Sequence, residues 1–111
     1  MGPLMKGDVV VATFPFSDLK SSKKRPALVL ASFPKDRVIL CQITSQSAAD
    51  VYAVSMAAAD FKVGGIRTAS FARPNYLFTA DASVIAYKAG VLADAKLDEI
   101  IGMLVEIVTA K

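Results

Sequence analysis

The sequence contains no histidine and only one cysteine, Cys41, among its 111 residues. The absence of histidine excludes every mechanism that relies on an imidazole, and a single cysteine excludes an intramolecular disulfide. Together, the two exclude a zinc site built from cysteine and histidine ligands. Cys41 lies inside an apolar stretch, so we expect it to be a core residue.

The chain also lacks a long hydrophobic run, although 54% of its residues are hydrophobic. Its apolar runs, such as residues 51–59, end well before the ~20 residues that are needed to span a bilayer. No early stretch has the basic and then apolar order of a signal peptide. We therefore expect no membrane association and a cytoplasmic location.

Length and hydrophobic content suit one compact domain with its own core. We expect this domain to span residues 5–111, because residues 1–4 precede a second methionine and are either a cloning remnant or an upstream start. The net charge of +3 is divided unevenly: residues 1–88 carry +5 and residues 89–111 carry −2. Such a split suits a protein whose first part meets an acidic partner.

Apolar stretches rich in β-branched residues predict strands at residues 9–14, 26–33 and 38–43, and the alternation of side chains predicts a fourth strand at residues 50–56. A tight turn at residues 34–37 predicts that the second and third of these strands form an antiparallel hairpin. Residues 66–78 also favour a strand, which Pro74 either places at a sheet edge or bends. Residues 82–89 fit a strand or a helix equally well.

The clearest helix lies near the end of the chain, where apolar residues recur at helical spacing and Asp94 is available as an N-cap. We expect this apolar stripe to face the core. Its members are Leu97, Ile100, Ile101, Leu104 and Val108. Short strands followed by one amphipathic helix predict a mostly β (α+β) fold, a small, strongly bent antiparallel sheet or barrel that the helix closes.

A cationic loop is predicted to meet an apolar strand at Arg25 and Pro26. Lys23, Lys24 and Arg25 place three positive charges there, which either attract a polyanion or keep a strand edge soluble. Proline disfavours the α region for the residue before it, so Arg25 is extended at the mouth of the strand. We therefore expect its guanidinium to be presented to solvent.

Four motifs follow one another along the first half of the chain: Lys6-Gly7-Asp8-Val9-Val10, Phe14-Pro15-Phe16, Lys24-Arg25-Pro26-Ala27-Leu28-Val29-Leu30 and Ile43-Thr44-Ser45-Gln46. In order and spacing they resemble the MazF/PemK/Kid family of toxins from type II toxin–antitoxin pairs, and residues 70–79 and 90–92 are also similar to it. The resemblance implies an SH3-like barrel of the CcdB/PemK kind with a C-terminal helix, and a homodimer. It further implies cleavage of single-stranded RNA at short sequences and control by a cognate acidic antitoxin.

The resemblance also implies roles for individual residues. Arg25 matches the arginine of the family's Arg-Pro motif, and Thr44 matches the hydroxyl residue at the end of the third strand. The resemblance implies that both residues are catalytic. Arg73 resembles a second active-site arginine of the PemK/Kid branch, whereas Asn75 stands where that branch has an aspartate. The glutamate that the MazF branch places in the loop before the arginine is also missing, from residues 20–22. The identity of the general base therefore stays open.

RNA can be cut without a metal or cofactor when its own 2′-OH attacks the adjacent phosphorus. This reaction needs a proton acceptor, positive charge for the phosphoryl oxygens and a proton for the departing 5′-oxygen. The bidentate fork of Arg25 suits the phosphoryl oxygens, where one such donor is worth ~3 kcal/mol. The hydroxyls of Thr44 and Ser45 suit a hydrogen bond to a phosphate oxygen. Asp18, the acid of the first long loop, is a candidate base and equally a turn residue.

Binding of unpaired RNA requires aromatic faces for stacking and groups that reach phosphates and base edges. Phe16 and Tyr76 lie beside turn residues and are candidates for stacking, and Gln46 is a candidate for a base edge. The candidate RNA-binding residues are therefore Phe16, Lys23, Lys24, Ser45, Gln46, Asn75 and Tyr76.

Two other functions fit the same barrel. The missing acids favour a non-catalytic binding module, either a degenerate toxin that titrates antitoxin or a protein-binding toxin like the gyrase-binding CcdB. A plain RNA-binding barrel is the third alternative, and its affinity would fall steeply with salt. RNA turnover that Arg25→Ala removes would distinguish the endoribonuclease from both.

Overall fold

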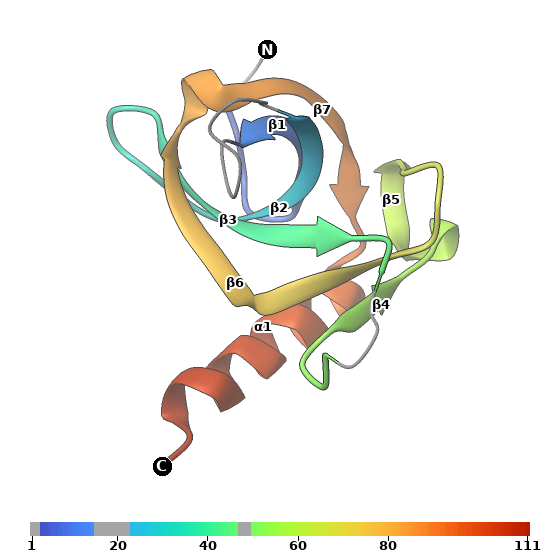
Figure 1. Cartoon of the computed structure of the whole chain (residues 1–111). Helices are drawn as coiled ribbons and strands as arrows, with labels where there is room; N and C mark the ends of the chain where they lie inside the picture. The colour runs from blue at the N-terminus through green and yellow to red at the C-terminus, as the bar shows by residue number, and fades with distance from the viewer. Residues whose placement is uncertain (1–2, 15–22, 47–49) are drawn as a thin grey trace.

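In a computed structural model, described for residues 3–14, 23–46 and 50–111, the chain forms one curled antiparallel sheet and one α-helix (Figure 1). The helix, α1, spans Asp94–Thr109, and two 3₁₀ turns lie at Ala58–Asp60 and Ala82–Val84. The strands are β1 (Asp8–Phe14), β2 (Lys23–Phe33), β3 (Arg37–Thr44), β4 (Val54–Met56), β5 (Phe61–Gly64), β6 (Ser70–Asp81) and β7 (Ile85–Leu92). Their order across the sheet is β4-β6-β3-β2-β1-β7-β5. The expected mostly β fold with a strongly bent antiparallel sheet and a C-terminal helix is confirmed.

The central strands β1, β2 and β3 are buried on both faces, because their side chains alternate between two cores. In β1, Val9 packs in the core between the sheet and α1, whereas Val10 packs in a second core inside the curl of the sheet. In β3, Cys41 belongs to the first core and Leu40 to the second. This two-sided burial explains why these strands are apolar runs and not alternating ones.

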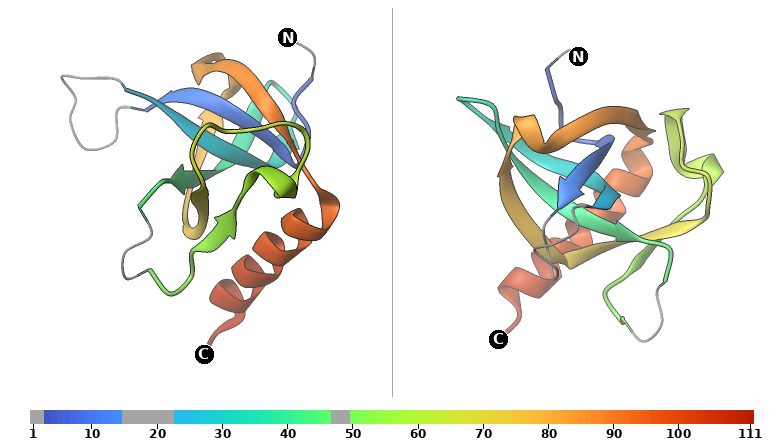
Figure 2. Two further views of the ribbon diagram at one scale, coloured as in Figure 1. Left: turned by 90° about the vertical axis from the view of Figure 1, so that its right-hand side faces the viewer. Right: turned by 45° about the horizontal axis from the view of Figure 1, so that its top comes forward.

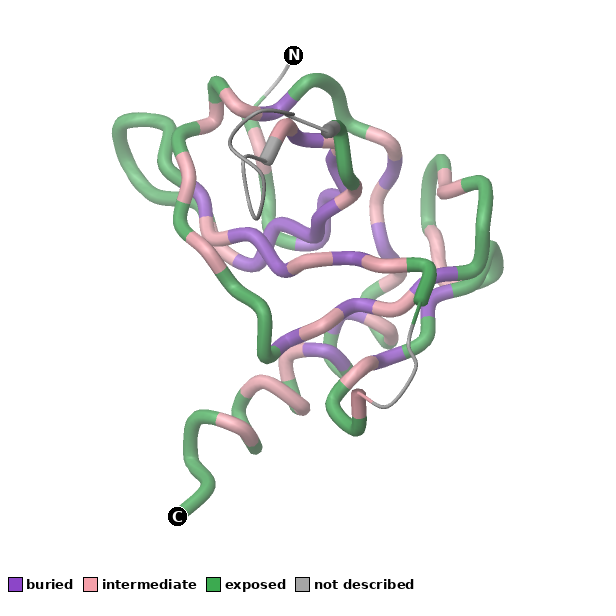
Figure 3. The backbone as a smooth tube through the Cα atoms, in the orientation of Figure 1, coloured by how far each residue is buried: buried purple, intermediate pink, exposed green. Residues whose placement is uncertain are grey.

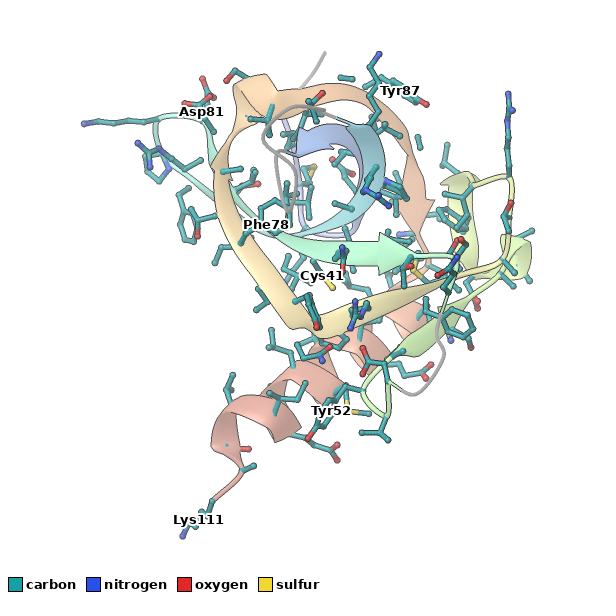
Figure 4. The ribbon with its side chains drawn as sticks, viewed as in Figure 1. Cys41, Tyr52, Phe78, Asp81, Tyr87 and Lys111 are labelled. Carbon is teal, nitrogen blue, oxygen red and sulfur yellow. The ribbon has the colours of Figure 1, made fainter. Side chains whose placement is uncertain are left out.

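Cys41 is fully buried in the core that α1 covers, as expected from the sequence (Figure 4). Burial raises the pKa of its thiol to about 12, because the thiolate would lose its hydration. The thiol is therefore protonated at neutral pH, and Cys41 is a packing residue and not a nucleophile.

Helix α1 packs on the sheet with its first half and extends beyond it with its second (Figures 1 and 2). Leu97 and Ile100 are buried, whereas Val108 is 68% exposed. The expectation that the whole apolar stripe faces the core is therefore wrong at Val108, because the sheet ends before the helix does (Figure 3). The expected cap is also different: Ala93 is the N-cap, and Asp94 pairs with Lys62 at 3.0 Å.

The three cations expected in a loop belong to β2 instead, since the ladder between β1 and β2 continues to the pair Phe14 and Lys23. Arg25 lies opposite Ala12 and is exposed, as expected. The strand expected at residues 50–56 is shorter and begins at Val54. Residues 50–53 form a turn because an oxygen of Asp50 accepts a hydrogen bond from the backbone N–H two residues later, at 2.9 Å.

Pro74 bends β6 and does not place it at an edge. On β3, Gln42 pairs with Arg73 and the preceding Cys41 pairs with Leu77, so residues 74–76 have no partner on that strand. Figure 1 shows the resulting corner in β6. Residues 82–89, left open by the sequence, form a 3₁₀ turn and then β7. Among the described residues, no helix is long and apolar enough to cross a membrane.

Candidate nucleic-acid interface

An open groove of about 860 Å³ lies at the start of β2 and the end of β3. The middle of β7 and the connection between β5 and β6 form its other side. Five of the residues proposed from the sequence line it, and all come from the two strand ends. They are Lys24, Arg25, Thr44, Ser45 and Gln46.

The antiparallel ladder between β2 and β3 brings Arg25 and Thr44 together. The ladder ends at the pair Ala27 and Gln42, and Arg25 and Thr44 each lie two residues beyond that pair on their own strand. Residues two apart on a strand project to the same face, so the guanidinium and the hydroxyl leave the same side of the sheet, and both line the groove. The hydroxyl oxygen of Thr44 accepts a hydrogen bond from the backbone N–H of Gln46 at 3.2 Å, which fixes the turn that follows β3.

The groove is electropositive. Lys24, Arg25, Arg67 and Lys88 line it, and the described lining residues include no carboxylate. Lys88 also forms an ion pair, because its ammonium lies 3.1 Å from the carboxylate of the buried Asp8. An open groove with this charge attracts polyanions.

The Gly7-Asp8 motif has a structural role beneath the groove. Gly7 has a φ of 98°, which a residue with a Cβ rarely adopts, and its backbone N–H donates to Val29 while its carbonyl accepts from Leu92. One carboxylate oxygen of Asp8 accepts from the backbone N–H of Met5 at 2.9 Å. The motif therefore anchors the start of the chain to β2 and β7 and positions Lys88.

Sequence reasoning did not identify the far wall of the groove. Arg67 and Thr68 come from the β5–β6 connection, and Tyr87 and Lys88 come from β7. The Tyr87 ring is 54% exposed, which suits stacking on an unpaired base (Figure 4). No local motif signals these residues, because long-range pairing brings them to the groove: β7 pairs with β1, where Val11 lies opposite Tyr87, and β5 pairs with β7 just before the connection that carries Arg67.

Arg73 lies outside this groove, in a cluster of its own. Its Nε donates to Oδ2 of Asp50 at 2.7 Å, and its Nη1 donates to Oε1 of Gln42 at 3.1 Å. The ring of Tyr76 covers one face of the guanidinium, with 3.6 Å from Cζ to the ring centroid. The Asn75 side chain lies near Asp50 and helps to lower the pKa of its carboxyl. We call Gln42, Asp50, Arg73, Asn75 and Tyr76 the Arg73 cluster.

The Arg73 cluster and the pair of Arg25 and Thr44 occupy neighbouring rows of one sheet face. Gln42 and Thr44 are two residues apart on β3, so they project to the same side and their Cα atoms are about 7 Å apart. Arg73 lies opposite Gln42. The candidate catalytic residues described by the structure are therefore adjacent in the sheet, although Arg73 does not line the groove.

The resemblance led us to expect an acid near Arg73 at position 75, and the structure instead places the carboxylate of Asp50 against Arg73. Sequence reasoning missed Asp50, which it took for the start of a strand. Two further candidates, Asp18 and Phe16, lie outside the described residues, as does the side chain of Lys23.

The contact between Asp50 and Arg73 makes the stability of the fold depend on pH. The hydrogen bond from Arg73 holds the pKa of Asp50 below its usual range. The unfolded chain lacks this contact, and its aspartate pKa is about 3.9. The contact therefore stabilises the fold fully above about pH 4 to 5, and the contribution is lost as the pH falls through the lower pKa of the folded state.

We expect the urea midpoint of the wild type to fall more steeply between about pH 5 and pH 3 than that of Asp50→Asn, which cannot titrate at this position. Equilibrium unfolding followed by circular dichroism at several pH values measures this. Parallel pH curves for the two proteins would show that the contact contributes nothing.

Solved structures with the same fold were found, whereas no curated protein matches the chain by sequence. An endoribonuclease from a mycobacterial species, solved with its cognate antitoxin, has a TM-score of 0.73 at 15% identity, covering 97% of this chain and 95% of that one. The Mycobacterium tuberculosis toxin MazF-mt6 has a TM-score of 0.72 at 16% identity, covering 94% and 98%. A MazE–MazF structure from Deinococcus radiodurans gives 0.75 at 19%, covering 96% of each chain. At these identities the likeness concerns the fold.

The sequence itself matches a family model over residues 5–108, almost the whole chain. That model describes the PemK-like, MazF-like toxins of type II toxin–antitoxin systems. The match includes both strand ends of the groove and the Arg73 cluster. Sequence and fold thus agree, and the chain belongs to the PemK-like, MazF-like toxin family.

Proposed function

We propose that this toxin cleaves single-stranded RNA without a metal ion, by attack of a ribose 2′-OH on the adjacent phosphorus. The observation that carries the proposal is the open groove that Arg25 and Thr44 both line, in which Arg25 is one of four cations. Its charge favours the phosphates of RNA, and its volume of about 860 Å³ leaves room for part of a nucleotide chain. Membership of the toxin family and the fold shared with proteins named endoribonuclease support the same function.

In this mechanism Arg25 binds the non-bridging oxygens of the scissile phosphate and stabilises the charge that grows on them. A guanidinium gives up its proton reluctantly, so charge stabilisation is the main role proposed for Arg25. The hydroxyls of Thr44 and Ser45 hydrogen-bond to the same phosphate. The bond from the 2′-oxygen to phosphorus forms as the bond to the 5′-oxygen breaks, and the departing 5′-oxygen takes a proton from water. The products are a 2′,3′-cyclic phosphate and a 5′-hydroxyl.

The proton of the 2′-OH requires an acceptor, and Asp18 remains a candidate for it. Along the groove, Lys24 and Arg67 are proposed to bind flanking phosphates. Gln46 is proposed to contact a base edge, which would make cleavage selective for short sequences, and Tyr87 to stack on an unpaired base. Roles for Lys23, Phe16, Asn75 and Tyr76 in RNA binding stay predictions.

Two protein partners belong to this proposal. A cognate antitoxin with an acidic segment would cover the electropositive groove, and it would act in the cytoplasm, where RNA is available. A second copy of the chain would cover the exposed apolar side chains on the second half of α1, Val105 and Val108. Sedimentation analysis of the purified protein tests the homodimer.

The experiment that tests the function is digestion of an unpaired RNA oligonucleotide in EDTA. We expect cleavage that leaves a 2′,3′-cyclic phosphate or the 3′-phosphate formed from it. Cleavage only after a divalent metal is added would refute the mechanism.

A non-catalytic binding toxin is the second candidate, and one observation favours it: the described lining of the groove offers no carboxylate as a base. Such a protein would capture an acidic peptide tightly and show no RNA turnover at any protein concentration. The same EDTA assay separates the two candidates.

A further inference from the structure

A buried carboxylate stands beside Arg73 with both of its oxygens engaged. The Asp50 side chain is 9% exposed. Its Oδ2 accepts from Nε of Arg73 at 2.7 Å, and its Oδ1 accepts from the backbone N–H of Tyr52 at 2.9 Å. A carboxylate that already accepts these hydrogen bonds is a poor acceptor for a substrate proton, but it is a firm anchor for a guanidinium.

Arg73 is restrained by three contacts that fix the plane of its guanidinium. Asp50 binds Nε, Gln42 binds Nη1 and the Tyr76 ring stacks on one face. The side chain nevertheless stays 23% exposed. A fixed guanidinium with an exposed part is organised in advance to bind a phosphate, because little rotamer freedom remains to be lost.

We infer that Asp50 is a positioning residue, which holds Arg73 so that its guanidinium binds an RNA phosphate next to the one bound by Arg25 and Thr44. The neighbouring rows of these residues on one sheet face carry this inference. It rests on the proposed function, because it assigns a role in the binding and cleavage of RNA.

The inference predicts that Asp50→Asn slows the cleavage of RNA without weakening its binding. Asp50 offsets part of the positive charge of Arg73, so Asp50→Asn makes this face more positive and binding of a polyanion no weaker. The same substitution weakens the hold on the guanidinium, and loose positioning of the neighbouring phosphate misplaces the reacting one, which slows the reaction by about 10- to 100-fold. A merely structural role would not separate the two measurements in this way.

The chain offers a matched control and a rescue. Asp81, at the far end of β6, accepts from the backbone N–H of Ser83 at 2.9 Å, with the same two-residue spacing as Asp50 and Tyr52 (Figure 4). Asp81→Asn therefore repeats the change in a turn remote from Arg73. Because the Asn75 side chain lies near Asp50, the double variant Asp50→Asn with Asn75→Asp returns a carboxylate to the Arg73 cluster.

Three measurements are made on these variants and the wild type. Single-turnover cleavage of RNA in EDTA gives the rate, and titration with the matching uncleavable 2′-deoxy oligonucleotide gives Kd. The 15N–1H NMR signal of Arg73 Nε reports whether the guanidinium is fixed. We expect Asp50→Asn to cleave about 10- to 100-fold more slowly with an equal or lower Kd, and to lose the Nε signal. Most of the rate and the signal should return in the double variant, and Asp81→Asn should match the wild type.

Cleavage by Asp50→Asn at the wild-type rate would overturn the inference and leave the proposed function intact. A loss of cleavage rate in Asp81→Asn as large as that in Asp50→Asn would do the same. If the wild type cleaves no RNA, the proposed function fails, and the NMR signal decides the inference alone. An Nε signal that shifts when the oligonucleotide binds, and that Asp50→Asn lacks, supports the positioning role. A signal insensitive to the oligonucleotide or to the substitution overturns it.

Discussion

Arg25→Ala is expected to slow the cleavage of unpaired RNA in EDTA by about 100- to 1000-fold, the usual effect of removing one donor to a developing oxyanion. The side chain is exposed at the mouth of the groove and makes no contribution to either core, so the fold should be unchanged. Rates with an end-labelled oligonucleotide measure the first effect, and circular dichroism measures the second.

Two further variants separate charge from geometry. Arg25→Lys keeps the charge but loses the bidentate fork, so it should recover RNA binding and only a small part of the rate. Lys24→Ala removes a neighbouring exposed cation from the same groove and should weaken binding modestly and equally for all sequences. Undiminished cleavage by Arg25→Ala would remove this residue from the mechanism.

Ile100→Ala is expected to lower the free energy of unfolding by about 2–5 kcal/mol, because it opens a cavity in the core between the sheet and α1. Ile100 is fully buried in that core. Val108→Ala, two turns later on the same helix, should change the free energy of the folded monomer by no more than about 0.5 kcal/mol, because the side chain is 68% exposed.

Urea unfolding of both variants at a low protein concentration tests this contrast. Repeating it at high concentration tests the proposed dimer, because a second copy that covers Val108 would make its substitution costly only there. A large effect of Val108→Ala at every concentration would contradict the exposed position of this residue. A small effect of Ile100→Ala would contradict the packing of the helix.

The parts of the site that could be predicted from the sequence are those that depend on a local hairpin. Arg25 and Thr44 lie at the ends of two strands joined by a tight turn, so a correct reading of that turn brings them together. The contact of Arg73 with Asp50 could not be predicted, because it joins residues 23 apart through the corner of β6. That corner depends on how β6 meets β3, which no periodicity reveals.

The predicted start and end residues of some strands were wrong for similar reasons. The charges of Lys23 and Lys24 favoured a loop, but both residues pair with β1 and therefore belong to β2. Asp50 lies in a stretch whose alternation favours a strand, but its side chain closes a turn with Tyr52. Long-range pairing and side-chain hydrogen bonds decided these positions over local preference.

Because the central strands are buried on both faces, folding and ligand binding depend on different residues of the chain. Residues in the middle of β1, β2 and β3 are committed to one core or the other, so the groove is lined by strand ends, connections and the exposed middle of β7. The proposed recognition residues, such as Gln46, Arg67 and Tyr87, can therefore be changed with little penalty to folding. This architecture permits toxins that share one fold to evolve different targets.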